Sequence, residues 1–137
     1  MKHFSVETLK QLMEMSDDFC ISLYMPTDRA AADNTDRIQF KNLMGQAETT
    51  ARKRFPKNKS VGEMIDKGRR LYEDEGFWRG QKDGLAVFLS PQEFRQYRLP
   101  LRFEKVVSVS RRPFIKPLIP LVMADSRFYV LALSQSG

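Results

Sequence analysis

The sequence predicts an α+β domain with a mixed β-sheet of about four strands, flanked by three to four helices, and a further apolar strand near the C-terminal end. Two observations carry this prediction. Short runs rich in β-branched and aromatic residues lie between longer segments whose apolar residues recur with helical spacing. The chain has 137 residues, of which 42% are hydrophobic and 29% are charged, and this suits a single domain with one modest core.

Four segments have the apolar spacing of amphipathic helices, namely 5–16, 36–55, 60–72 and 117–122. Ser5 is placed to cap the first, and Ser60 with Glu63 has the spacing of a capping box at the start of the third. Pro117 suits the first turn of the fourth, because its missing N–H would have no partner there. The apolar face of the longest helix comprises Phe40, Leu43, Met44, Ala47 and Ala51, with Ile38 beside them. We expect residues 74–81 to be irregular.

Five runs predict β-strands, namely 19–25, 85–89, 94–99, 106–109 and 128–133. The run at 85–89 is apolar throughout, which predicts a central strand covered on both faces. The run at 94–99 is more polar, so we expect it nearer an edge. An apolar strand with no covering helix after it is unusual at the end of a domain. We therefore expect residues 1–124 to form one domain and residues 125–137 to begin a following domain of a longer protein.

Catalytic and metal-binding side chains are scarce. Cys20 is the only cysteine and His3 the only histidine, so a zinc site built on such ligands is nearly excluded. No Walker loop, Gly-x-Gly-x-x-Gly or Gly-x-Ser-x-Gly motif occurs. We expect neither an enzyme nor a cofactor, although a mechanism based on carboxylates alone stays open. The lone cysteine and the lack of a long apolar run predict a cytoplasmic protein without membrane contact.

Positive charge is concentrated in the second part of the chain. Residues 1–51 carry five Lys or Arg against eight Asp or Glu, whereas residues 52–137 carry eighteen against nine, for a net charge of +6. One cationic cluster lies at 52–59, and a second at 94–116 is opposed only by Glu104. Clustered cations attract polyanions through their field and through counterion release. The alternative is a solvated surface without a partner.

Six motifs follow one another in order along the chain. They are Ile21-Ser22-Leu23-Tyr24-Met25-Pro26, Asn34 with Arg37–Met44 and Ala47-Glu48, Phe77-Trp78, Asp83-Gly84-Leu85-Ala86-Val87-Phe88-Leu89, Tyr97-x-Leu99-Pro100, and Phe114-x-Lys116-Pro117-Leu118. In this order and spacing the chain resembles the N-terminal domain of the bacterial archaeo-eukaryotic release factor-like family, relatives of the class I release factor and Pelota. The resemblance covers nearly the whole chain and implies an α+β fold that acts at the ribosomal decoding site.

The resemblance also implies partners and an activity. In the release factor, the loop before the long helix carries an Asn-Ile-Lys-Ser motif that inspects the stop codon, and the aligned stretch 33–37 shares only Asn34. The Gly-Gly-Gln tripeptide of the middle domain, which drives peptide release, does not occur here. By analogy we expect non-catalytic binding to the ribosome and its rRNA, in rescue or hibernation, with an elongation factor left open as a second partner.

Ten residues are candidates for RNA binding. They form three groups: Asn34, Arg37 and Lys41; then Arg52, Lys53, Arg54, Lys57 and Lys59; then Arg111 and Arg112. Arg37 and Lys41 share one face at the start of the long helix, where free N–H groups also attract phosphate. The structural alternatives are that Asn34 or Asp36 caps the helix and that Arg37 pairs with the aspartate at 33 or 36. Cations at 52–54 would equally complement a helix C-terminus.

Two further alternatives remain open from the sequence. Phe77 and Trp78, beside Arg79, could stack on bases, or they could plug the core between a helix and the sheet. The whole domain could also be a protein-interaction module with no direct RNA contact, whose basic surface is incidental.

Overall fold

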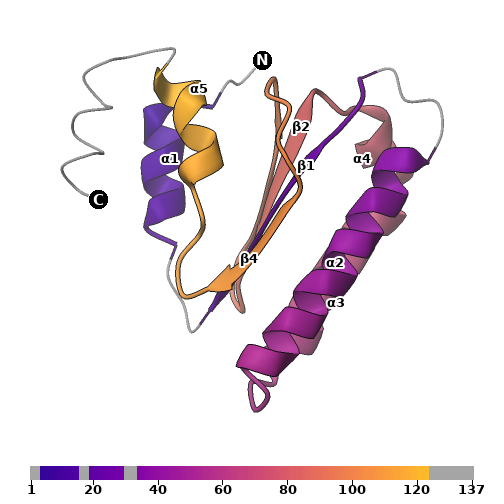
Figure 1. Ribbon diagram of the computed structural model, residues 1–137, viewed down its shortest axis with the longest axis vertical. Coiled ribbons are helices and arrows are strands. Elements are labelled where there is room, and N and C mark those ends of the chain that lie inside the picture. The colour runs from indigo at the N-terminus through magenta and orange to yellow at the C-terminus, as the bar shows by residue number, and fades with distance from the viewer. Residues whose placement is uncertain (1–3, 16–18, 30–33, 124–137) are drawn as a thin grey trace.

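A computed structural model describes residues 4–15, 19–29 and 34–123 of the chain. These residues fold into three layers, with α1 and α5 on one side of a β-sheet and α2, α3 and α4 on the other (Figure 1). The elements are α1 (Val6–Met13), β1 (Cys20–Pro26), α2 (Thr35–Arg54), α3 (Ser60–Glu73), α4 (Glu75–Arg79), β2 (Gly84–Leu89), β3 (Phe94–Leu99), β4 (Val106–Ser110), the 3₁₀ turn η1 (Lys116–Leu118) and α5 (Ile119–Met123).

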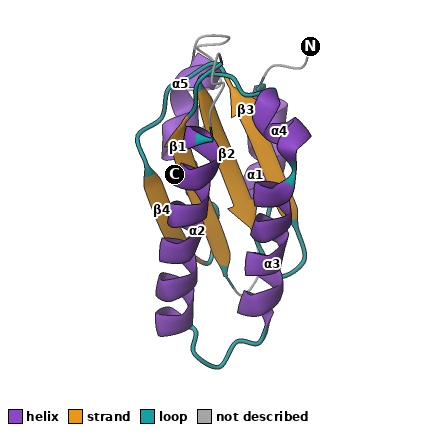
Figure 2. Cartoon of the chain, turned by 90° about the vertical axis from the view of Figure 1, so that its right-hand side faces the viewer, coloured by secondary structure: helices purple, strands orange, loops and turns teal. Residues whose placement is uncertain are grey.

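The sheet has four strands in the order β3-β2-β1-β4, which confirms the α+β class, the central place of β2 and the edge position of β3. All three strand pairs are antiparallel, so the expectation of a mixed sheet is wrong. The reason lies in the connection between β1 and β2. The chain runs along α2 and back along α3, which lie side by side over the sheet (Figure 2), and it therefore enters β2 in the direction opposite to β1.

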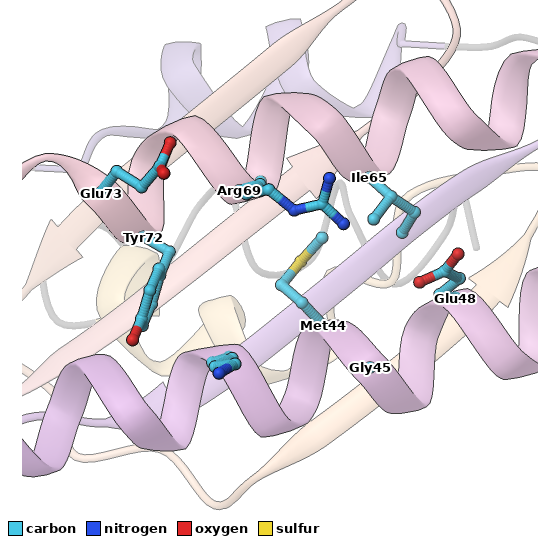
Figure 3. A pocket seen from close by; sticks show the side chains of 9 residues that line it. Met44, Gly45, Glu48, Ile65, Arg69, Tyr72 and Glu73 are labelled. Atoms are coloured by element: carbon cyan, nitrogen blue, oxygen red, sulfur yellow. The ribbon is translucent and has the colours of Figure 1, made fainter.

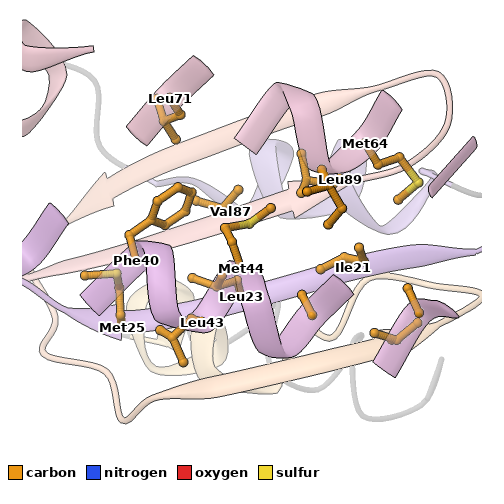
Figure 4. Packing of buried hydrophobic residues seen from close by; sticks show 14 of the residues in the cluster. Ile21, Leu23, Met25, Phe40, Leu43, Met44, Met64, Leu71, Val87 and Leu89 are labelled. Carbon is orange, nitrogen blue, oxygen red and sulfur yellow. The ribbon is translucent and has the colours of Figure 1, made fainter. Parts of the chain in front are cut away.

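The strands alternate between two cores because successive side chains of a strand point to opposite faces. Ile21, Leu23 and Met25 of β1 belong to the core under α2 and α3 (Figure 4), whereas Cys20 and Tyr24 belong to the core under α1 and α5. The predicted apolar face of α2 is buried at Phe40, Leu43, Met44, Ala47 and Ala51, whereas Ile38 beside it is exposed. Burying each such Leu or Phe contributes about 1.5–3 kcal/mol.

The segment after β4 is held against the sheet by β1. The Phe114 N–H donates to the Ser22 Oγ at 2.9 Å, and the Tyr24 hydroxyl donates to the Phe114 carbonyl. On the same side, the Ser5 Oγ accepts the Thr8 N–H at 3.1 Å and caps α1, as its position predicts. Both ends of the described chain therefore pack into the core under α1 and α5, which we call the second core.

Two local predictions are wrong. Residues 74–81 are not irregular, because Asp74 accepts the Phe77 N–H at 3.1 Å and caps the short helix α4. The capping box at Ser60 does not form. Instead, Ser60 is the first residue of α3 and its N–H donates to the Asn58 Oδ1 at 2.9 Å.

Two expectations concern the end of the chain. The predicted strand at 128–133 and the domain boundary near residue 124 lie outside the described residues. In the part of the chain that the structure does describe, no helix is both long and apolar enough to cross a membrane.

Candidate nucleic-acid interface

Helix α2 carries two of the predicted groups, one toward each end. Asn34, Arg37 and Lys41 lie at its start, and Arg52 begins the second group at its last turn. A rise of 1.5 Å per residue places Arg37 and Arg52 about 22 Å apart along the helix axis. The structure therefore does not bring the two groups together into one site.

Arg37 and Lys41 share one face of α2, as their spacing predicts, and this face meets Tyr72 of α3. The Arg37 Nε donates to the Tyr72 carbonyl at 2.8 Å, and the guanidinium carbon lies 4.8 Å from the centroid of the Tyr72 ring. The Lys41 Nζ lies 5.7 Å from the same centroid. The main-chain partner gives Arg37 a role in holding α2 to α3, which differs from the predicted alternative of an aspartate.

Asn34 is exposed at the start of α2. Its carbonyl accepts the Ile38 N–H at 2.9 Å, but its side chain makes no capping bond. The neighbouring Asp36 is buried and accepts the Asp28 N–H at 3.0 Å. The side-chain amide of Asn34 is therefore not used to cap α2 and faces solvent.

A pocket of about 380 Å³ opens between α2 and α3 next to Lys41 (Figure 3). Tyr72 extends from α3 toward α2, Arg69 lies along α3 and pairs with Asp66 at 3.2 Å, and Met44 lies between the two helices. The pocket has an apolar floor and a rim with both signs of charge, since Glu48 and Glu73 also line it. The contact of Tyr72 with the two cations is not foreseen from the sequence, because helical spacing does not show which residue of a second helix lies opposite.

The second group forms the tip of the hairpin made by α2 and α3, which projects beyond the ends of the strands (Figure 2). Two of its five cations are engaged: Arg52 pairs with Glu48 at 2.9 Å, and the Arg54 guanidinium donates to the Val109 carbonyl. The other three are exposed and form no ion pair with any described residue, namely Lys53, Lys57 and Lys59.

Arg111 and Arg112 directly follow β4. Both are exposed, and the Arg112 carbonyl accepts the Ser110 hydroxyl at 2.9 Å. Because Arg54 holds the carbonyl of Val109, two residues before Arg111, the third predicted group adjoins the base of the hairpin tip. The structure thus associates the second and third groups and leaves the first at the other end of α2.

Phe77 and Trp78 pack in the interior. Phe77 is buried, its ring meets the Trp78 ring edge-on at 4.9 Å, and the Trp78 Nε1 donates to the Leu71 carbonyl at 2.9 Å. These contacts favour the core alternative over base stacking.

Cys20 is buried in the second core. In the ranges 4–15, 19–29 and 34–123, no three His, Cys, Asp or Glu side chains gather in a way that could hold a metal ion.

Comparison with known proteins does not name a family for this chain. No protein-family model matches it, and no curated protein matches it.

Proposed function

We propose that this domain binds RNA without catalysing a reaction, that its target is the ribosome, and that the tip of the α2–α3 hairpin makes the main phosphate contacts. The observation that carries the proposal is the exposure of three lysine side chains, Lys53, Lys57 and Lys59. These side chains project at the tip, exposed and without an acidic partner among the described residues.

The tip is positive because no acidic residue in its own segment balances the charge of its lysines and arginines. Between Glu48 and Glu63 the chain contains no carboxylate, whereas residues 52–59 contain five cations. Lysine ammonium groups on such a projection contact phosphates without reading sequence, and each contact releases counterions from the nucleic acid. Arg111 and Arg112 extend the same positive region onto the end of β4.

The other end of α2 supplies a second, smaller contact. Asn34 and Lys41 are exposed there, while Arg37 is held by Tyr72 and positions the face that carries Lys41. The likeness to release-factor N-terminal domains supports the ribosomal decoding region as the target, with a rescue or hibernation role in the cytoplasm. An elongation factor would be a second partner in such a role.

Co-sedimentation with bacterial ribosomes over a salt series tests the proposal. The wild-type domain is expected to bind at low salt and to dissociate steeply as salt rises. The variant Lys53→Glu/Lys57→Glu is expected to lose binding. The matched control is Lys105→Glu/Lys116→Glu, which changes the net charge equally at exposed positions outside the tip and is expected to retain binding.

Two outcomes would count against this function. Equal loss in both double variants would show that only net charge matters and that the tip is no site. Binding that persists at high salt would favour the alternative, a protein-interaction module whose contacts are mainly apolar.

A further inference from the structure

A second surface lies on the opposite edge of the sheet from β4. Among the described residues, strand β3 pairs only with β2, so its other side is a free edge in this part of the chain. At the hairpin between them, the Ser90 N–H donates to the Glu93 carbonyl at 2.9 Å. Bonded and non-bonded pairs alternate along an antiparallel ladder, so the N–H and carbonyl groups of Phe94 and Gln96 point away from β2. These groups are available to pair with another strand.

The free edge of β3 borders a groove beside α3. A pocket of about 300 Å³ lies there, and its lining comes from both elements: Lys67, Arg70, Leu71, Asp74, Phe94 and Gln96. Leu71 and Phe94 supply an apolar wall, since both belong to or pack against the core under α2 and α3. Lys67 and Arg70 are three residues apart on α3 and so lie on one face of it.

The lining of the groove carries a net positive charge, because Lys67 and Arg70 outnumber the one carboxylate, Asp74. Lys67 and Arg70 form no ion pair with a described residue. Asp74 is held at the start of α4, where it accepts the Phe77 N–H, and Glu93 next to the groove pairs with Arg95 at 3.1 Å.

From these features we infer that the β3–α3 groove binds an extended acidic peptide segment of a partner protein. The segment would add a strand to β3, with main-chain bonds to Phe94 and Gln96 supplying affinity and side-chain pockets supplying specificity. On the side facing α3, an apolar side chain would contact Leu71 and Phe94, and a carboxylate two residues along would meet Lys67 or Arg70. Peptide groups, and not phosphates, match the alternating donors and acceptors of the strand edge. This surface is separate from the hairpin tip.

Fluorescence anisotropy with labelled peptides tests the inference. The probe is Val-Thr-Glu-Thr-Val-Thr-Glu-Thr, which presents Val and Glu alternately on one face of a strand. The charge control replaces Glu by Lys, and the main-chain control carries N-methyl groups at every second residue. Only the unmodified acidic peptide is expected to bind. Equal binding of the Lys peptide or of the N-methylated peptide would overturn the inference.

Variants of the domain give an independent readout. Arg70→Glu is expected to weaken peptide binding by about tenfold or more. The matched control is Arg69→Glu, because Arg69 is also exposed but lines the pocket between α2 and α3. Gln96→Pro removes one outward N–H and leaves the β2 ladder intact, so it is expected to abolish binding while circular dichroism stays unchanged. Equal effects of Arg69→Glu and Arg70→Glu, or a groove that takes a labelled RNA hairpin in place of the peptide, would refute a peptide site.

Discussion

The Arg37 Nε donates to the Tyr72 carbonyl at 2.8 Å, and the Arg37 guanidinium lies over the Tyr72 ring. Tyr72 is the next-to-last residue of α3, so its carbonyl has no partner within its own helix. Arg37 therefore satisfies an end group of α3 and places a cation at the negative end of that helix. A residue selected from the sequence for RNA binding has a structural role that must be separated from any functional one.

Arg37→Ala is expected to lower the free energy of unfolding by about 1–2 kcal/mol, because it removes a charged hydrogen bond and a contact with an aromatic ring. Urea denaturation measures this. Lys41→Ala is the matched control, since its ammonium group only approaches the same ring at 5.7 Å, and it is expected to change stability little. If the two variants were equally stable, the Arg37–Tyr72 contact would contribute nothing.

The hairpin tip is expected to set the salt dependence of RNA binding. Changing Arg52, Lys53, Lys57 and Lys59 together to alanine removes up to four phosphate contacts and should reduce the slope of log affinity against log salt by about two to three. Titration of a labelled RNA hairpin at several salt concentrations measures the slope. An unchanged slope would show that these side chains do not contact the RNA.

Tyr24 is expected to make the fold sensitive to strong base. Burial raises the pKa of its phenol above the ordinary value of 10.0, and the nearby Cys20 adds to the shift. Above about pH 10 the unfolded chain loses the proton while the folded chain keeps it, so stability falls by up to about 1.4 kcal/mol per pH unit.

Tyr24→Phe isolates this effect. At neutral pH it should cost about 1 kcal/mol, because the Phe114 carbonyl loses its donor. Between about pH 9 and pH 11 its stability should fall less steeply than that of the wild type. Urea unfolding over this range gives the comparison, and parallel curves for the two proteins would contradict the assignment.

Substitution by alanine is expected to change the stability of the protein in opposite directions at two glycines. At Gly45 on α2 an added Cβ would meet nothing within 4 Å, so Gly45→Ala should stabilise the protein by about 0.5–1 kcal/mol through helix propensity. At Gly84, the first residue of β2, the Cβ would lie 1.9 Å from the Leu101 carbonyl oxygen and 2.6 Å from Phe103.

Because main-chain atoms cannot yield as a flexible side chain can, Gly84→Ala should cost about 1–3 kcal/mol or more. Thermal unfolding of the two variants measures both effects. A rise in melting temperature for Gly84→Ala, or a fall for Gly45→Ala, would be inconsistent with this packing.

The sequence by itself determined the type and approximate position of most elements. The apolar spacing of α2, the uniformly apolar β2 and the cap at Ser5 all have the structure expected of them. Such signals are local, since they depend on residues a few positions apart that share a face or a turn. The same local reasoning missed α4, where Asp74 caps a helix too short to show a period.

Only the tertiary structure decided which elements lie against each other and therefore what each charged side chain does. The connections in space make all strand pairs antiparallel. They place Arg37 against Tyr72 and Arg54 against the Val109 carbonyl. Three lysines at the tip stay exposed, namely Lys53, Lys57 and Lys59. The tertiary structure also placed Lys67 and Arg70 beside a free strand edge. The physical reason is that a cation's partner is chosen by proximity in space, and neither composition nor spacing along the chain contains that information.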